Sequence, residues 1–141
     1  MRADQSLVGG FRRTIQLGRE SYERGVAFVD RLYAHNLRPT FEHLWGSHLN
    51  DIRWQQEQII YGVFLGDHSV LSATETELVS MTALMCGEER APKLWHMRGF
   101  RRLGPTLEDS KQIHHCVREV AAWCGKRTDG WPGPDDVEKE V

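Results

Sequence analysis

Histidine and cysteine are the residue types in this chain that could bind a transition metal, and their spacing decides whether they can. The chain has seven histidines and three cysteines. The densest group, His114-His115-Cys116, lies in a segment with helical spacing, where consecutive side chains point about 100° apart. Three such side chains cannot bind one ion together. We therefore expect no metal site, and we interpret His115 as a surface residue with His114 and Cys116 half-buried.

Motifs for two other chemistries are missing from the sequence. It contains no P-loop, no Gly-x-Gly-x-x-Gly and no Gly-x-Ser-x-Gly, which removes the support for nucleotide binding and for serine-hydrolase catalysis. With neither a metal ligand set nor a phosphate-binding loop, we expect no cofactor. His96 is a further candidate for acid–base chemistry, although a single histidine beside Phe100 and Leu103 is by itself typical of a packing residue.

The elements that would position these residues are all helical. Apolar residues recur every three or four positions and never alternate over a sustained stretch, which predicts an all-α fold of about six helices. Helices are expected over residues 5–34 (interrupted near Gly18), 40–64, from 72–74 to Gly87, 88–103 and 106–124. Tyr22, Val26, Val29 and Tyr33 are expected to form one apolar stripe, and Leu107, Ser110, His114, Val117, Ala121 and Cys124 another.

Two helix starts are marked by capping residues. Ser72 with Glu75, and Thr74 with Glu77, form two overlapping capping boxes before an apolar run. Thr106 is followed by acidic residues, and Gly104-Pro105 ends the preceding helix. The run 78–86 is apolar or small on every face, which is typical of a helix surrounded by others or buried between subunits.

The chain resembles the carboxymuconolactone decarboxylase family over about residues 20–127. The residues that carry the resemblance, in order along the chain, are Tyr22-Glu23-Arg24-Gly25, Ala27-Phe28-Val29-Asp30, Tyr61-Gly62, Leu71, Glu77-Leu78-Val79, Trp95-His96-Met97-Arg98-Gly99 and Cys124-Gly125. The resemblance implies an alkyl hydroperoxidase D-like fold and assembly into dimers, trimers or hexamers.

The alkyl hydroperoxidase D branch carries a glutamate nineteen residues before the histidine of a Cys-x-x-Cys-x-x-x-His motif. Glu77 stands nineteen residues before His96, but Glu89 and Pro92 occupy the two cysteine positions. Because peroxide reduction needs a thiolate and a resolving thiol, the redox branch is excluded. Decarboxylase members often place a glutamate four residues before the histidine, where this chain has Pro92. These departures from the pattern imply a divergent member of the family that the chain resembles.

The resemblance implies that His96 and Glu77 are catalytic, because a neighbouring carboxylate fixes the imidazole tautomer for proton transfer. Candidate substrate-binding residues are Arg98, Trp95, Tyr61 and Glu89. Within one chain Arg98 fits a salt bridge better than a contact with the same ligand, and it would bind an anion more readily if it reached a neighbouring subunit. Glu89 fits the first turn of a helix. Trp95 and Tyr61 could wall an apolar pocket for an aromatic or polyketide-like ligand.

Three functions fit this sequence. The first is a cofactor-free decarboxylase of a small cyclic or aromatic-precursor carboxylic acid, such as a lactone acid of secondary metabolism. The second is an isomerase or cyclase that works by proton transfer, and the third is a non-catalytic oligomeric binding protein. Carbon dioxide release distinguishes the first from the others.

The composition and net charge indicate which kinds of partner the chain can attract. The chain is 40% hydrophobic and 27% charged with a net charge of −2, which offers no general attraction for nucleic acid or anionic lipid. No uncharged apolar run is long enough for a transmembrane helix, and no signal segment opens the chain. We expect a cytoplasmic protein with one domain over residues 1–127. Residues 128–141, rich in Gly, Pro and charge, are expected to form a solvated or partner-dependent tail.

Overall fold

The computed structural model describes residues 17–141, and these residues are helical with no strand. The all-α prediction is confirmed. In chain order the elements are α1 (Arg19–Tyr33), α2 (Leu37–Trp45), α3 (Leu49–Trp54), a π-helical segment (Gln55–Leu65), α4 (Ala73–Met85), α5 (Arg90–Arg102) and α6 (Leu107–Trp123), with 3₁₀ turns at 34–36, 46–48, 134–136 and 138–140. Residues 5–16 of the first expected helix lie outside the described part.

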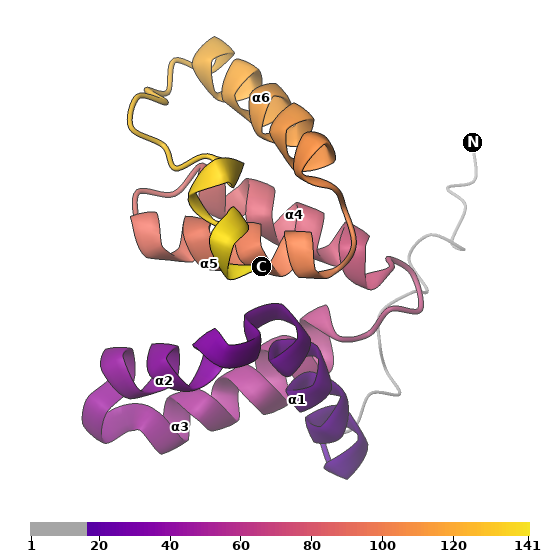
Figure 1. The fold of residues 1–141 in the computed structure, drawn as a ribbon. Helices are drawn as coiled ribbons and strands as arrows, with labels where there is room; N and C mark the ends of the chain where they lie inside the picture. The colour runs from indigo at the N-terminus through magenta and orange to yellow at the C-terminus, as the bar shows by residue number, and fades with distance from the viewer. Residues whose placement is uncertain (1–16) are drawn as a thin grey trace, which may run out of the picture.

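The helices form two groups. α1, α2, α3 and the π-helical segment lie together, and α4, α5 and α6 make the second group (Figure 1). The first group packs around Phe28, Val29, Leu32 and Tyr61 with Leu103. A second apolar cluster contains Met81, Met85, Met97, Phe100 and Val137. Because α5 packs against both α1 and α4, it joins the two groups.

Local sequence explains most helix boundaries. Ser72 and Glu75 form the capping box expected at the start of α4, and Thr106 with Asp109 caps α6. Gly104, with φ of 120°, ends α5. The second capping box, Thr74 with Glu77, does not form, because Glu77 is turned into the interior.

The helix expected over residues 40–64 is wrong as a single element. It breaks at Gly46, which has φ of 46°, and after Trp54 it continues in π-helical form. π-helical turns are rare and usually short, and they are frequent at functional sites. A Cβ on Gly25 would lie 2.7 Å from the backbone nitrogen of Gly62, so these two glycines let α1 pack directly on the π-helical segment.

The apolar stripe of α1 is rotated from the expected one. Val29 is buried, but Tyr22 is exposed, and the buried face consists of Ser21, Gly25, Phe28, Val29 and Leu32. The stripe of α6 is closer to expectation: Ser110, His114 and Ala121 are buried, whereas Cys124 is exposed. α4 is covered on one face only, since Met81 and Met85 are buried while Val79 is 59% exposed.

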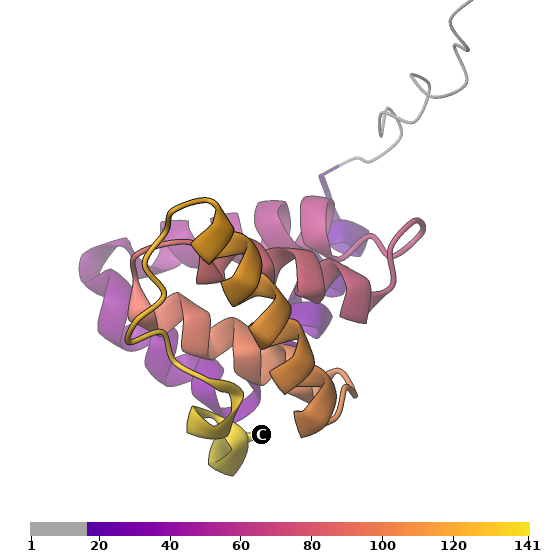
Figure 2. The same ribbon diagram turned by 90° about the horizontal axis from the view of Figure 1, so that it is seen from above.

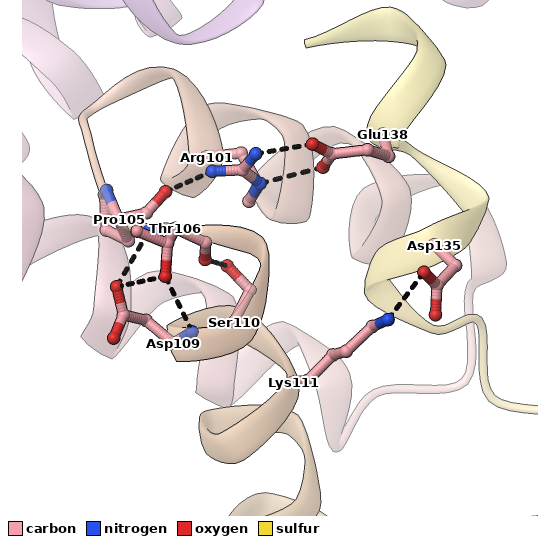
Figure 3. Close-up of polar contacts among 8 residues, drawn as sticks. All are labelled: Arg101, Pro105, Thr106, Asp109, Ser110, Lys111, Asp135 and Glu138. Carbon is pink, nitrogen blue, oxygen red and sulfur yellow. Dashed lines mark hydrogen bonds and ion pairs between the residues drawn. The ribbon is translucent and has the colours of Figure 1, made fainter.

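Residues 131–140, named here the C-terminal strap, do not form the solvated tail expected. The strap lies along α5 beside α6 (Figure 2), and its Val137 is completely buried in the second apolar cluster. Glu138 pairs with Arg101 at 2.6 Å and Asp135 with Lys111 at 2.8 Å (Figure 3). The acidic residues that suggested solvation instead meet basic residues of α5 and α6.

Arg102 also links the two groups of helices. Its guanidinium donates to the carbonyls of Leu32 (2.9 Å) and Tyr33 (2.6 Å) at the end of α1, which have no partner within their own helix. Within residues 17–141, no helix has the length and apolar character needed to cross a membrane.

Candidate active site

The central feature of the site is a buried pair formed by Glu77 of α4 and His96 of α5. The Nδ1 atom of His96 lies 2.8 Å from Oε1 of Glu77, and both side chains are buried. A short turn containing Gly87 connects the two helices, so residues similarly distant from the turn face each other. The nineteen-residue spacing therefore brings this carboxylate to this imidazole.

Gly99, one turn after His96, makes room for the carboxylate. A Cβ at this position would lie 2.9 Å from Oε1 of Glu77 and 3.1 Å from Cδ2 of Leu32. The sequence predicts that Gly99 allows the close approach of another helix, and the structure confirms this. The two helices that approach are α4 and α1.

The burial of Glu77 controls its charge. Loss of solvation raises the pKa of the Glu77 carboxyl above its ordinary value, and the hydrogen bond and charge of His96 oppose this rise. Its other oxygen, Oε2, is buried without a hydrogen-bond partner among the described residues. When Nδ1–H of His96 donates to Oε1, Nε2 is the nitrogen free to exchange a proton with a ligand.

His96 lines a cavity of about 370 Å³ between the two groups of helices. This volume falls within the usual range for small-molecule sites. The π-helical segment contributes one wall, and α1, α2, α4 and α5 contribute the others. The lining residues are Val29, Tyr33, Leu37, Thr40, Phe41, Trp45, Gln56, Ile60, Tyr61, Leu65, Ser80, Ala83, Leu84, Pro92, Trp95 and His96.

Two tyrosines supply hydroxyl groups to this cavity. Tyr61 Oη donates to Tyr33 Oη at 3.4 Å, and the ring of Tyr33 meets that of His96 edge to face, with centroids 6.2 Å apart. Burial is the main cause that raises the pKa of both phenols, that of Tyr61 well above its usual value. Both are therefore protonated near neutral pH, and the proton of Tyr33 is left for a ligand.

The structure brings four of the six predicted site residues together. His96, Trp95 and Tyr61 line the cavity, and Glu77 lies directly behind His96. Arg98 and Glu89 do not line it. Arg98 is buried against the C-terminal strap, where it pairs with Glu140 at 2.7 Å, and Glu89 is exposed at the start of α5.

Sequence reasoning missed four polar residues in the lining: Tyr33, Thr40, Gln56 and Ser80. Tyr33 was visible only as part of an apolar stripe. Gln56 faces the cavity from the π-helical segment, whose register cannot be derived from a 3.6-residue period. Thr40 and Ser80 carry no local signal that separates them from surface residues.

The group at residues 114–116 has a structural position. Nε2–H of His114 donates to the carbonyl of Pro132 at 3.0 Å, and burial lowers the pKa of His114. His115 is exposed as expected, and Cys116 is exposed rather than half-buried. In the part of the chain that the structure describes, no three His, Cys, Asp or Glu side chains are grouped as metal ligands would be.

Comparisons of the chain with protein-family models, curated proteins and solved structures give no match. The family resemblance and the fold family that it implies stay predictions.

Proposed function

We propose that this protein is a cofactor-independent acid–base enzyme that decarboxylates a small cyclic or aromatic-precursor carboxylic acid. In this proposal it is a divergent relative of the carboxymuconolactone decarboxylases with an alkyl hydroperoxidase D-like fold. The observation that carries the proposal is the buried Glu77–His96 pair, 2.8 Å apart, in the wall of an apolar cavity. Such a pair holds an imidazole in one orientation with one nitrogen free, which proton transfer requires.

The proposed reaction needs few groups. The bond between the substrate's α-carbon and its carboxyl carbon breaks, carbon dioxide leaves, and the electron pair moves into an adjacent carbonyl or lactone as an enolate. His96 then gives the Nε2 proton to the carbon and regains one from water. Tyr33 is placed to donate a hydrogen bond to the enolate oxygen, where the negative charge develops.

The character of the lining supports the substrate class. Most lining residues are aliphatic or aromatic, and none of those described is Lys or Arg. A carboxylate in such a site is poorly solvated, whereas the transition state for carbon dioxide loss spreads its charge over a larger group. The flat side chains of Trp95 and Tyr61 suit a ring-shaped substrate.

A second candidate is an isomerase or cyclase in which His96 moves a proton without loss of carbon. The absence of Lys and Arg from the described lining favours it, because a neutral carbonyl compound needs no cationic partner. Its mechanism uses the same three groups: His96 as base and acid, Glu77 to orient it, and Tyr33 at the oxygen.

The test is turnover of a panel of cyclic β-keto acids and lactone carboxylic acids in deuterated water, with carbon dioxide and deuterium incorporation both measured. Wild-type protein is expected to release carbon dioxide and to label the product carbon. His96→Gln should lose about 10²–10⁴-fold in the chemical step. His115→Gln, which alters an exposed histidine of α6, is the matched control and should turn over as wild type does.

Other results of this experiment would favour a different function. Deuterium exchange or rearrangement without carbon dioxide would replace decarboxylation by the isomerase or cyclase function. Unchanged turnover in His96→Gln, at an equal folded fraction, would make His96 a packing residue and overturn both candidates. Ligand binding without any turnover would identify a binding protein.

A further inference from the structure

A second cavity lies on a different face of α5 from the candidate active site. It measures about 380 Å³, is open to the surface, and is bounded by the turn after α4, the first turn of α5, and residues 126–132. Arg90 and Lys93, three residues apart on α5, line this second cavity, whereas Pro92, Trp95 and His96 line the first. The two cavities therefore have no lining residue in common.

The charge of the second cavity is opposite in sign to that of the chain. Its charged lining residues are Arg90, Lys93, Lys126 and Arg127, with Glu88 and Asp129, in a protein whose net charge is −2. The ion pairs of the two arginines are long and exposed: Arg90 lies 3.8 Å from Asp136, and Arg127 lies 3.5 Å from Asp129. Exposed pairs of this kind are weak, and the hydrogen bond that Arg90 donates to the carbonyl of Gly130 is long, at 3.5 Å, so both guanidinium groups can turn toward an anion.

Lys93 distinguishes this cavity from an ordinary basic surface. Its side chain is only 4% exposed, and its ammonium lies 4.9 Å from the centre of the Trp131 ring. No carboxylate of residues 17–141 lies within ion-pair distance of it. The ammonium is accessible from the cavity, but a lysine held this deeply without a counter-charge is unfavourable, and a contact with an aromatic face compensates only in part. The position thus lacks an anion.

The first turn of α5 adds neutral donors. Glu89, the residue before the helix, makes no side-chain hydrogen bond to the helix start, so the first backbone N–H groups of α5 have no side-chain cap. Uncapped N–H groups at a helix start favour negative groups, phosphate in particular. Lys93 lies in this same turn region and lines the same cavity.

We propose that this second cavity is a binding site for a small phosphate-bearing molecule. The ammonium of Lys93 would contact the phosphate, Lys126 and the two arginines would surround it, and the rest of the cavity would hold the remainder of the molecule. Guanidinium and ammonium donors suit phosphate oxygens, and the volume exceeds what an inorganic ion needs. This inference does not depend on the proposed catalytic function.

The test is calorimetric titration of the full chain with inorganic phosphate, pyrophosphate and a simple phosphomonoester at low ionic strength, with citrate as the carboxylate probe. We expect saturable binding of the phosphate compounds at one site per chain, weaker at high salt. Lys93→Met should weaken it at least about tenfold, the usual effect of losing a hydrogen bond to a charged group. Lys139→Met, which removes the same charge from an exposed position outside the cavity, should leave binding unchanged.

A second variant distinguishes loss of binding from loss of folding. Lys126 is exposed and lines the cavity, so Lys126→Met should fold normally and still weaken binding. Absence of saturable binding would overturn the proposal. Equal weakening of binding in Lys139→Met would also overturn it, because it would indicate only a nonspecific attraction by positive charge. Citrate binding as tight as pyrophosphate binding would overturn the assignment to phosphate.

Discussion

At the scale of single residues, Glu77 is completely buried, and one of its side-chain oxygens has no hydrogen-bond partner among the described residues. An ionised carboxylate in that position is costly, which is why the pKa of Glu77 is raised. The folded state therefore holds the Glu77 proton more tightly than the unfolded chain does. The stabilisation that results is complete below the ordinary pKa of 4.5 and is lost as pH rises through the raised pKa.

This property predicts a difference in pH dependence between wild type and Glu77→Gln. As pH increases from below 4.5 through the raised pKa, wild type should lose unfolding free energy relative to the variant, because the amide does not ionise. Urea unfolding over a series of pH values measures the difference. Glu75→Gln on the same helix provides the contrast: its pKa is lowered by the bonds to Ser72, so the relative change should have the opposite sign. Parallel curves for wild type and Glu77→Gln would contradict the prediction.

Some of the site residues could be identified from sequence. Glu77 and His96 were identified through the family resemblance, and the short turn between α4 and α5 explains why residues nineteen apart meet. Trp95 and Tyr61 were identified from their aromatic character. Arg98 could not be placed, because its partner Glu140 belongs to a segment that was expected to be solvated. Tyr33 was missed because a tyrosine in an apolar stripe looks like a core residue until its hydroxyl is seen to meet that of Tyr61.

At the scale of elements, the contact of α4 with α5 depends on Gly99. Replacing it with alanine puts a Cβ 2.9 Å from the Glu77 carboxylate and 3.1 Å from Leu32. Gly99→Ala should therefore lower the unfolding free energy by about 1–3 kcal/mol, as overpacking does, and should weaken the Glu77–His96 bond. Chemical denaturation and the His96 imidazole NMR shifts measure the two effects.

The control for this variant is Gly133→Ala, since a Cβ there meets nothing within 4 Å and φ of −105° suits alanine. It should change stability little. Equal stability of Gly99→Ala and wild type would mean that α4 and α5 can move apart without loss, and that the close approach is not required.

Helix starts were predictable because capping residues act over three or four positions, as Ser72 and Thr106 do. The break within residues 40–64 and the change to π-helical form could not be predicted, because both depend on tertiary contacts. Gly46 adopts positive φ, and Gly62 and Gly25 bring the π-helical segment against α1. Periodicity in sequence detects an apolar face but not the number of residues per turn.

At the scale of the whole molecule, the C-terminal strap completes the second apolar cluster. Val137→Ala should lower the unfolding free energy by about 1–3 kcal/mol, because it leaves a cavity among Met81, Met85 and Phe100. Val141→Ala, at a position 47% exposed, should change it by less than about 0.5 kcal/mol. Equal effects of the two substitutions, measured by urea unfolding, would mean that the strap does not stay packed on α5 in solution.

The open face of α4 is the main support for the predicted assembly. Val79 is 59% exposed, and Ala83 and Cys86, four and seven residues on, are exposed on the same side. A contiguous exposed apolar stripe indicates an interaction surface. We expect a dimer or larger assembly at micromolar concentration in analytical ultracentrifugation, dissociated by Val79→Lys. Val70→Lys, in the loop before α4, should leave it intact. A monomer in the wild-type protein would remove the interface argument.

The π-helical register of residues 55–65 constrains how the gene can change. Deleting one codon there would let the segment close with ordinary α-helical hydrogen bonds, and the residues after the deletion, Tyr61 among them, would turn about the helix axis. The shortened protein would gain a more regular helix and lose a wall of its cavity. Length changes are normally tolerated in loops. Here a deletion of even one residue inside a helix would alter the cavity, so we expect selection to act against it.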